Sequence, residues 1–63
     1  MLINGKAMDL GKTVSITELL QHLKLDADKI VVEVNMEIIP RERYSMHLAG
    51  EDQVELISFV GGG

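Results

Sequence analysis

The sequence contains no cysteine and carries few positive charges. Without cysteine the chain can form no disulfide, no thiolate zinc site and no cysteine nucleophile. Six lysine and arginine residues against ten aspartate and glutamate residues give a formal net charge of −4 at pH 7. This balance argues against a nucleic-acid partner, because basic patches supply most of the affinity for nucleic acid. It suits a protein partner that has a basic docking surface.

Long apolar runs, linkers and internal repeats are also missing. No apolar run approaches the ~20 residues of a membrane span, and the N-terminus shows no basic and apolar leader, so we expect a cytoplasmic protein without a membrane partner. The 46% hydrophobic and 25% charged content is typical of a folded globular chain. A domain of 63 residues has a small core and is too short for both a substrate pocket and a catalytic apparatus. Its length therefore favours a carrier, adaptor or binding module over an enzyme.

Local signals predict a hairpin at the N-terminus. Asn4-Gly5 is a strong hairpin signal, because both central positions of a type I′ turn need positive φ. Residues 1–3 and 6–10 should therefore pair as antiparallel strands, with Ile3 opposite Lys6. The side chains expected to face the core are those of Met1, Ile3, Met8 and Leu10.

A helix should follow. Ser15 and Glu18 have the spacing of a capping box, in which each side chain binds the backbone amide of the other. One apolar face then recurs at helical spacing, and we expect the helix to end near Lys24 with Leu25 packed back onto the core. The residues of that face are Ile16, Leu19, Leu20 and Leu23.

Three strand-like segments occupy the second half of the chain. Ile30–Val34 and Glu37–Ile39 flank a turn at Asn35-Met36, where glycine would fit the second position more easily. Residues 41–50 look irregular, with Tyr44 and Leu48 as anchors. Val54–Val60 is the last strand. Its alternation places Val54 and Leu56 inward and Glu55, Ile57 and Phe59 outward.

This order of elements predicts an α+β protein with a β-grasp fold. One helix can cover one face of a mixed four- to five-stranded sheet, in which the first and last strands run parallel at the centre. The C-terminus then leaves the body of the protein. We predict a β-grasp domain over residues 1–60 and a flexible glycine tail over residues 61–63.

The glycine tail (Gly61-Gly62-Gly63) is the candidate functional segment. Three residues without Cβ span about 10 Å and can enter a channel too narrow for other residues. A terminal carboxylate is ionised at neutral pH and is a poor electrophile, so its chemistry needs activation, for example as an acyl-adenylate made with ATP.

Outward Ile57 and Phe59 beside the tail suggest a docking patch for a partner. His22 and His47 have no ligand spacing, so we predict neither a metal site nor a catalytic side chain.

Several segments of the chain together resemble the ThiS family of small sulfur carriers in thiamin biosynthesis. The matching residues are Asn4-Gly5, the helix from Ser15 to Leu23, Val32-Glu33-Val34-Asn35, Glu37-Ile38-Ile39-Pro40-Arg41, Val54-Glu55-Leu56-Ile57 and Phe59-Val60-Gly61-Gly62-Gly63. The chain departs from the family at two turn positions, where Met36 and Glu51 replace the usual glycines.

The resemblance implies a carrier cycle in which the chain binds no cofactor of its own. A ubiquitin-activating-like enzyme would use ATP to adenylate the carboxylate of Gly63, with Gly62 as its partner in the tail motif. Sulfur from a cysteine desulfurase would convert the adenylate to a thiocarboxylate, and thiazole synthase would accept that sulfur for the thiazole ring.

Three other functions remain open from the sequence. The chain could serve as a molybdopterin-type sulfur carrier, although such carriers are usually longer and end differently. It could be a β-grasp binding module without tail chemistry, or a ubiquitin-like modifier that is conjugated to protein lysines.

Overall fold

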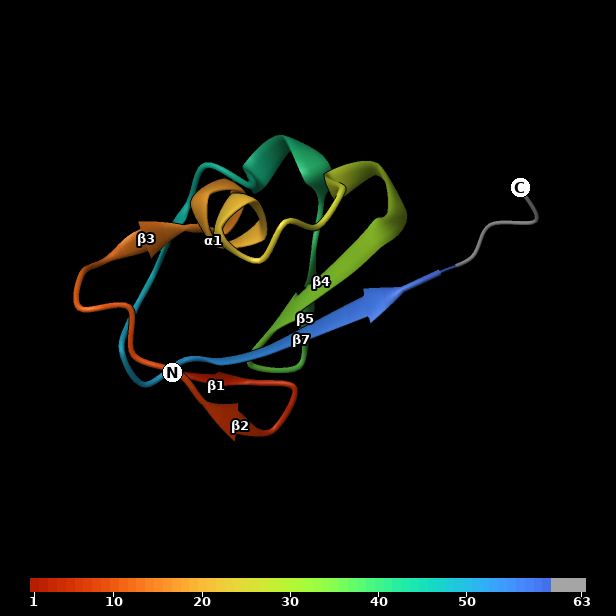
Figure 1. Ribbon diagram of the computed structural model, residues 1–63. Helices are drawn as coiled ribbons and strands as arrows, with labels where there is room; N and C mark the ends of the chain where they lie inside the picture. Colours follow the sequence, from red (N-terminus) through yellow and green to blue (C-terminus); the bar gives the residue numbers. More distant parts are fainter. Residues whose placement is uncertain (60–63) are drawn as a thin grey trace.

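The computed structural model describes residues 1–59, and Figure 1 shows a sheet with one α-helix on one of its faces. The five-stranded sheet has the order β2-β1-β7-β4-β5. Its strands are β1 (Leu2–Ile3), β2 (Lys6–Ala7), β4 (Ile30–Val34), β5 (Glu37–Ile39) and β7 (Gln53–Ser58). The helix is α1 (Ile16–His22), and two short 3₁₀ helices are η1 (Ala27–Lys29) and η2 (Arg41–Arg43). Within the described residues, no helix has the length and apolar character needed to cross a membrane.

The last strand lies in the middle of the sheet. Strand β7 runs parallel to β1, with Ile3 opposite Val54, and antiparallel to β4, with Val32 opposite Leu56. The mixed five-stranded sheet, the parallel first and last strands and the single covering helix confirm the predicted β-grasp fold.

The N-terminal hairpin forms as predicted and is joined to β7. Asn4 and Gly5 have φ angles of 52° and 82°, and Ile3 pairs with Lys6. The Asn4 amide donates to the Val54 carbonyl at 2.9 Å, and the Asn4 side-chain oxygen accepts from the Leu56 amide at 2.8 Å. Ile3 is buried in the core, and the three other side chains that were predicted to face the core are partly buried and pack against it.

The capping box of α1 is also present. The Ser15 hydroxyl accepts from the Glu18 amide at 3.1 Å, and the Glu18 carboxylate accepts from the Ser15 amide at 2.8 Å. Three residues of the predicted face are buried, namely Ile16, Leu19 and Leu20, and Leu23 packs against the core partly buried.

The helix ends in a Schellman turn without glycine. Lys24 has a φ of 59° and donates its amide to the Gln21 carbonyl at 3.1 Å, while the Leu25 amide donates to the Leu20 carbonyl at 2.9 Å. Leu25 is 38% exposed, so the prediction that it packs onto the core was wrong. Its backbone is used to close the helix end, and its side chain remains at the surface.

Residues 41–50 are more regular than the sequence indicated. They contain η2 and the strand β6 (His47–Leu48), which pairs with β3 (Val14–Ser15) in a second, two-stranded sheet. The anchors Tyr44 and Leu48 are buried as predicted. Strands of two residues are too short to show a period of two, which is why the sequence did not reveal this pair.

The turn between β4 and β5 places a methionine in an unfavourable conformation. Asn35 and Met36 have φ angles of 52° and 71°, and the Met36 side chain is 91% exposed. The Asn35 side chain donates to the Asp52 carboxylate and accepts from the Gln53 amide, both at 3.0 Å. The left-handed conformation is therefore held by Asn35, while Met36 gains little burial in return.

We predict that Met36→Gly raises the free energy of unfolding by about 0.5–1 kcal/mol. The left-handed conformation costs an L-residue about 1–2 kcal/mol, and the greater unfolded-state entropy of glycine offsets part of this gain. Urea unfolding measures the change. Met36→Ala is the matched control because it removes the side chain but keeps Cβ; an equal gain from alanine would contradict the argument.

We also predict that the capping box makes stability depend on pH in the acidic range. The hydrogen bond from the Ser15 amide lowers the pKa of Glu18 from its ordinary value of 4.5. The resulting stabilisation is complete above pH 4.5 and is lost as the pH falls through the lower, folded-state pKa. In thermal unfolding, Glu18→Gln should be less stable than the parent above pH 4.5, and the difference should shrink below it. A difference that stays constant with pH would show that the charge contributes nothing.

Candidate functional site

The C-terminal end of β7 presents exposed apolar side chains. Val54 and Leu56 face inward and are 1% and 9% exposed, whereas Ile57 and Phe59 face outward and are each 45% exposed. The predicted alternation is therefore confirmed. The glycine tail, Gly61 to Gly63, lies outside the described residues, so its reactive role and the domain boundary at residue 60 stay predictions.

Ile57 and Phe59 belong to a larger apolar surface on the outer face, by which we mean the face of the five-stranded sheet opposite α1. In the register of the sheet, Ile57 lies opposite Val31 on β4. Ile38 on β5 is 64% exposed, and Leu2 on β1 is 39% exposed. The exposed members of this outer-face patch are Leu2, Ile38, Ile57 and Phe59. Ile38 and Phe59 border one groove near the end of β7, whereas Leu2 lies opposite Gln53 at the beginning of that strand. Exposed apolar side chains at a strand end are typical of an interaction site.

Two carboxylates lie within the outer face. Glu33 on β4 is directly opposite Glu55 on β7, a like-charged pairing that is unfavourable in a ladder. Asp52 lies near Glu55 in the sequence, but its carboxylate accepts from the Asn35 side chain and from the Ala49 amide, the latter at 2.7 Å. Asp52 therefore stabilises turns, while Glu33 and Glu55 remain available to a basic group.

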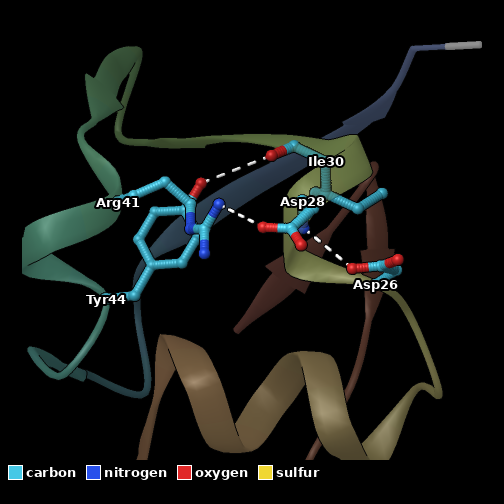
Figure 2. A network of polar contacts seen from close by, with 5 residues as sticks. All are labelled: Asp26, Asp28, Ile30, Arg41 and Tyr44. Atoms are coloured by element: carbon cyan, nitrogen blue, oxygen red, sulfur yellow. Dashed lines mark hydrogen bonds and ion pairs between the residues drawn. The ribbon is translucent and has the colours of Figure 1, made fainter. Parts of the chain in front are cut away.

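A shallow groove of about 310 Å³ lies beside the end of β7. Apolar side chains from β4, β5 and η1 line it together with Phe59, and Asp28 and Arg41 also border it. Figure 2 shows the Arg41 guanidinium paired with the Asp28 carboxylate, and the Tyr44 hydroxyl donating to the Ile30 carbonyl at 3.4 Å. The Phe59 amide donates to the Lys29 carbonyl at 3.2 Å. The segment around η1 thus holds the last described residue of the chain, and no pattern in the sequence indicated that role for Lys29.

The histidines take no part in this site. His22 ends α1, and His47 lies on β6, and both are exposed. Among residues 1–59, no three His, Cys, Asp or Glu side chains gather as metal ligands would.

These features define a β-grasp protein with an exposed apolar sheet face at the end of its last strand. The fold is similar to the crystal structure of the thiamine biosynthesis protein ThiS from Geobacter metallireducens, with a TM-score of 0.80 and 36% identity. The similarity covers 98% of this chain and 96% of that one.

The sequence comparisons give the family. The ThiS family model matches residues 1–63, and the chain therefore belongs to the ThiS family of sulfur carriers in thiamin biosynthesis. It is 41% identical over 63 residues to the sulfur carrier protein ThiS of Bacillus subtilis, covering 97% of this chain and 96% of that protein. It is also 33% identical over 64 residues to a thiazole synthase of Paramagnetospirillum magneticum, where the match takes all of this chain but only 20% of the longer protein.

Proposed function

We propose that the carboxylate of Gly63 is converted to a thiocarboxylate, which donates its sulfur to the thiazole ring of thiamin. The observation that carries this proposal is the Gly61-Gly62-Gly63 ending, which directly follows the central strand and the outer-face patch. Membership of the ThiS family supports it, because the chain matches the sulfur carrier protein ThiS of Bacillus subtilis over nearly the full length of both proteins.

The chemistry proceeds in two stages on a partner enzyme that binds ATP. A carboxylate oxygen of Gly63 attacks the α-phosphorus of ATP, pyrophosphate leaves, and an acyl-adenylate forms. Hydrosulfide, or the persulfide of a cysteine desulfurase, then attacks the carbonyl carbon, and AMP leaves with the bonding electron pair. When a persulfide is the donor, a thiol must reduce the resulting disulfide to release the thiocarboxylate.

In this proposal the carrier contributes reach and docking, and none of its side chains performs catalysis. The four residues after Phe59 can span at most about 14 Å at ~3.5 Å each. Any enzyme that acts on Gly63 must therefore bring its surface close to Phe59. Glycine lets the tail pass a narrow channel in both the adenylating enzyme and thiazole synthase.

The outer face gives these partners a surface of defined chemistry. Ile57 and Phe59 supply apolar contact, and the facing Glu33 and Glu55 favour a lysine or arginine on the partner. Thiazole synthase is the proposed sulfur acceptor, and the matching segment within the thiazole synthase of P. magneticum supports this choice. In that protein the matching segment and the rest of the thiazole synthase belong to one chain, so they need not meet by diffusion. We propose that this cycle takes place in the cytoplasm.

We predict a mass increase when the protein is incubated with ATP, the adenylating enzyme and a sulfur source. Replacement of one oxygen by sulfur adds about 16 Da to the intact mass. The increase should vanish when Gly63 is deleted and when one residue is appended after it. No increase in the parent protein would favour a binding module, and an increase without transfer to thiazole synthase would favour a different sulfur acceptor such as the molybdopterin pathway.

We predict that Phe59→Asp weakens binding to the adenylating enzyme at least 10-fold without unfolding the carrier. Phe59 is half-exposed, so its replacement should cost less than about 1 kcal/mol of stability, whereas loss of an apolar anchor at an interface costs more than that in affinity. Calorimetry and thermal unfolding measure the two effects. Leu56→Asp is the matched control and should unfold the protein, since it buries an unpaired charge. If Phe59→Asp binds the adenylating enzyme with unchanged affinity, Phe59 does not belong to the docking patch.

A further inference from the structure

We propose that the Asp28–Arg41 ion pair is a positioning device that fixes the root of the tail, by which we mean Phe59 and its hydrogen bond to Lys29. The inference rests on the proposed function, because it concerns how far Gly63 can reach. It assigns Arg41 no contact with the reacting atoms.

The root is the last point at which the described chain is hydrogen-bonded to the rest of the fold, just beyond the end of the β4–β7 ladder. The Phe59 amide donates to the Lys29 carbonyl at 3.2 Å, and the register before it pairs Ser58 with Ile30 and Ile57 with Val31. Four residues follow Phe59 in the sequence. If the bond at Phe59 opens, the next outward-facing pair is Ile57 with Val31, and six residues extend beyond it. Their maximum reach rises from about 14 Å to about 21 Å.

The backbone on either side of the Lys29 carbonyl, which accepts from Phe59, is held by hydrogen bonds. On one side, the Lys29 amide donates to the Asp26 carbonyl, and the Asp26 side chain accepts from the Asp28 amide, both at 2.9 Å. On the other, the Tyr44 hydroxyl donates to the Ile30 carbonyl at 3.4 Å. Arg41 connects the two sides, because its carbonyl accepts from the Tyr44 amide at the end of η2 and its side chain pairs with Asp28 on η1 (Figure 2).

A weak ion pair can determine how often the hydrogen bond between Phe59 and Lys29 is open. The ion pair is solvent-exposed, with side-chain exposures of 60% for Arg41 and 70% for Asp28, and such a pair changes an equilibrium by at most about 5-fold. That factor is negligible for global unfolding. It is large for a terminal hydrogen bond, because the ends of ordered segments open with free energies near zero.

The effect on the reaction should appear in substrate binding. An enzyme site has a fixed depth, so a carrier whose root is open must order two further residues when it binds. Once the tail is bound, the enzyme itself holds Gly63. We therefore expect loss of the ion pair to raise KM for the carrier and to leave kcat unchanged.

Amide hydrogen exchange measured by NMR tests the root directly. In Arg41→Gln and in Asp28→Asn, the exchange rate of the Phe59 amide should rise about 2- to 5-fold relative to that of the Leu56 amide. The double variant should show no larger increase than either single variant, because both remove the same interaction. Arg41→Lys should retain part of the protection. In the parent protein, about 1 M salt should reproduce the variants, since it screens exposed charges.

Arg43→Gln is the matched control, because it removes the same charge from the same short helix and Arg43 forms no ion pair among the described residues. Unchanged Phe59 exchange in Arg41→Gln, equal acceleration in Arg43→Gln, or additive single variants would each overturn the assignment.

With the adenylating enzyme and ATP, Arg41→Gln should raise KM up to about 5-fold at constant kcat. Faster exchange without a change in KM would refute the positioning role. Exchange does not depend on tail chemistry, so failure of the parent protein to form a thiocarboxylate would count against the proposed function alone.

Discussion

The parallel pairing of β1 with β7 is the constraint on which the rest of the molecule depends. It joins the first strand to the beginning of the last strand and places the last strand at the centre of the sheet. Asn4 strengthens this arrangement, because both its amide and its side chain bind the backbone of β7. The first half of β7 is therefore held by β1 on one side and by β4 on the other, and its last residues continue along β4 alone.

A single helix on a five-stranded sheet divides the protein into two surfaces with different uses. The inner face is closed by α1 and carries the core, including Val32 and Val54, which are almost completely buried. The outer face has no covering layer within the described residues, and it carries exposed apolar side chains together with the opposed Glu33 and Glu55. A core of this size cannot use both faces, so the face left over is the one available to partners. Because the outer face extends to the end of β7, the proposed function links docking to delivery of the tail by geometry.

The features that the sequence revealed are those decided within a few residues. The Asn4-Gly5 turn, the Ser15–Glu18 capping box and the alternation along β7 each follow from local backbone and side-chain chemistry, and each is present. The features that it did not reveal depend on distant partners. The β3–β6 pair joins residues more than thirty positions apart, and Lys29 matters only because Phe59 ends beside it. Leu25 was placed wrongly since its role in the helix end is carried by its backbone rather than by its apolar side chain.

The central position of β7 also affects the order in which the protein can be assembled. Residues 1–52 contain the β1–β2 and β4–β5 hairpins, but in the five-stranded sheet these two hairpins touch only through β7. A growing or truncated polypeptide that lacks β7 therefore has two separate halves of a sheet and exposes the apolar residues of both. Contacts between residues far apart in the sequence form late in folding, and here they must wait for the strand that precedes the glycines. The complete five-stranded sheet therefore forms only after the chain has been synthesised through β7. A partner that binds the folded sheet consequently selects chains that include the root of the tail.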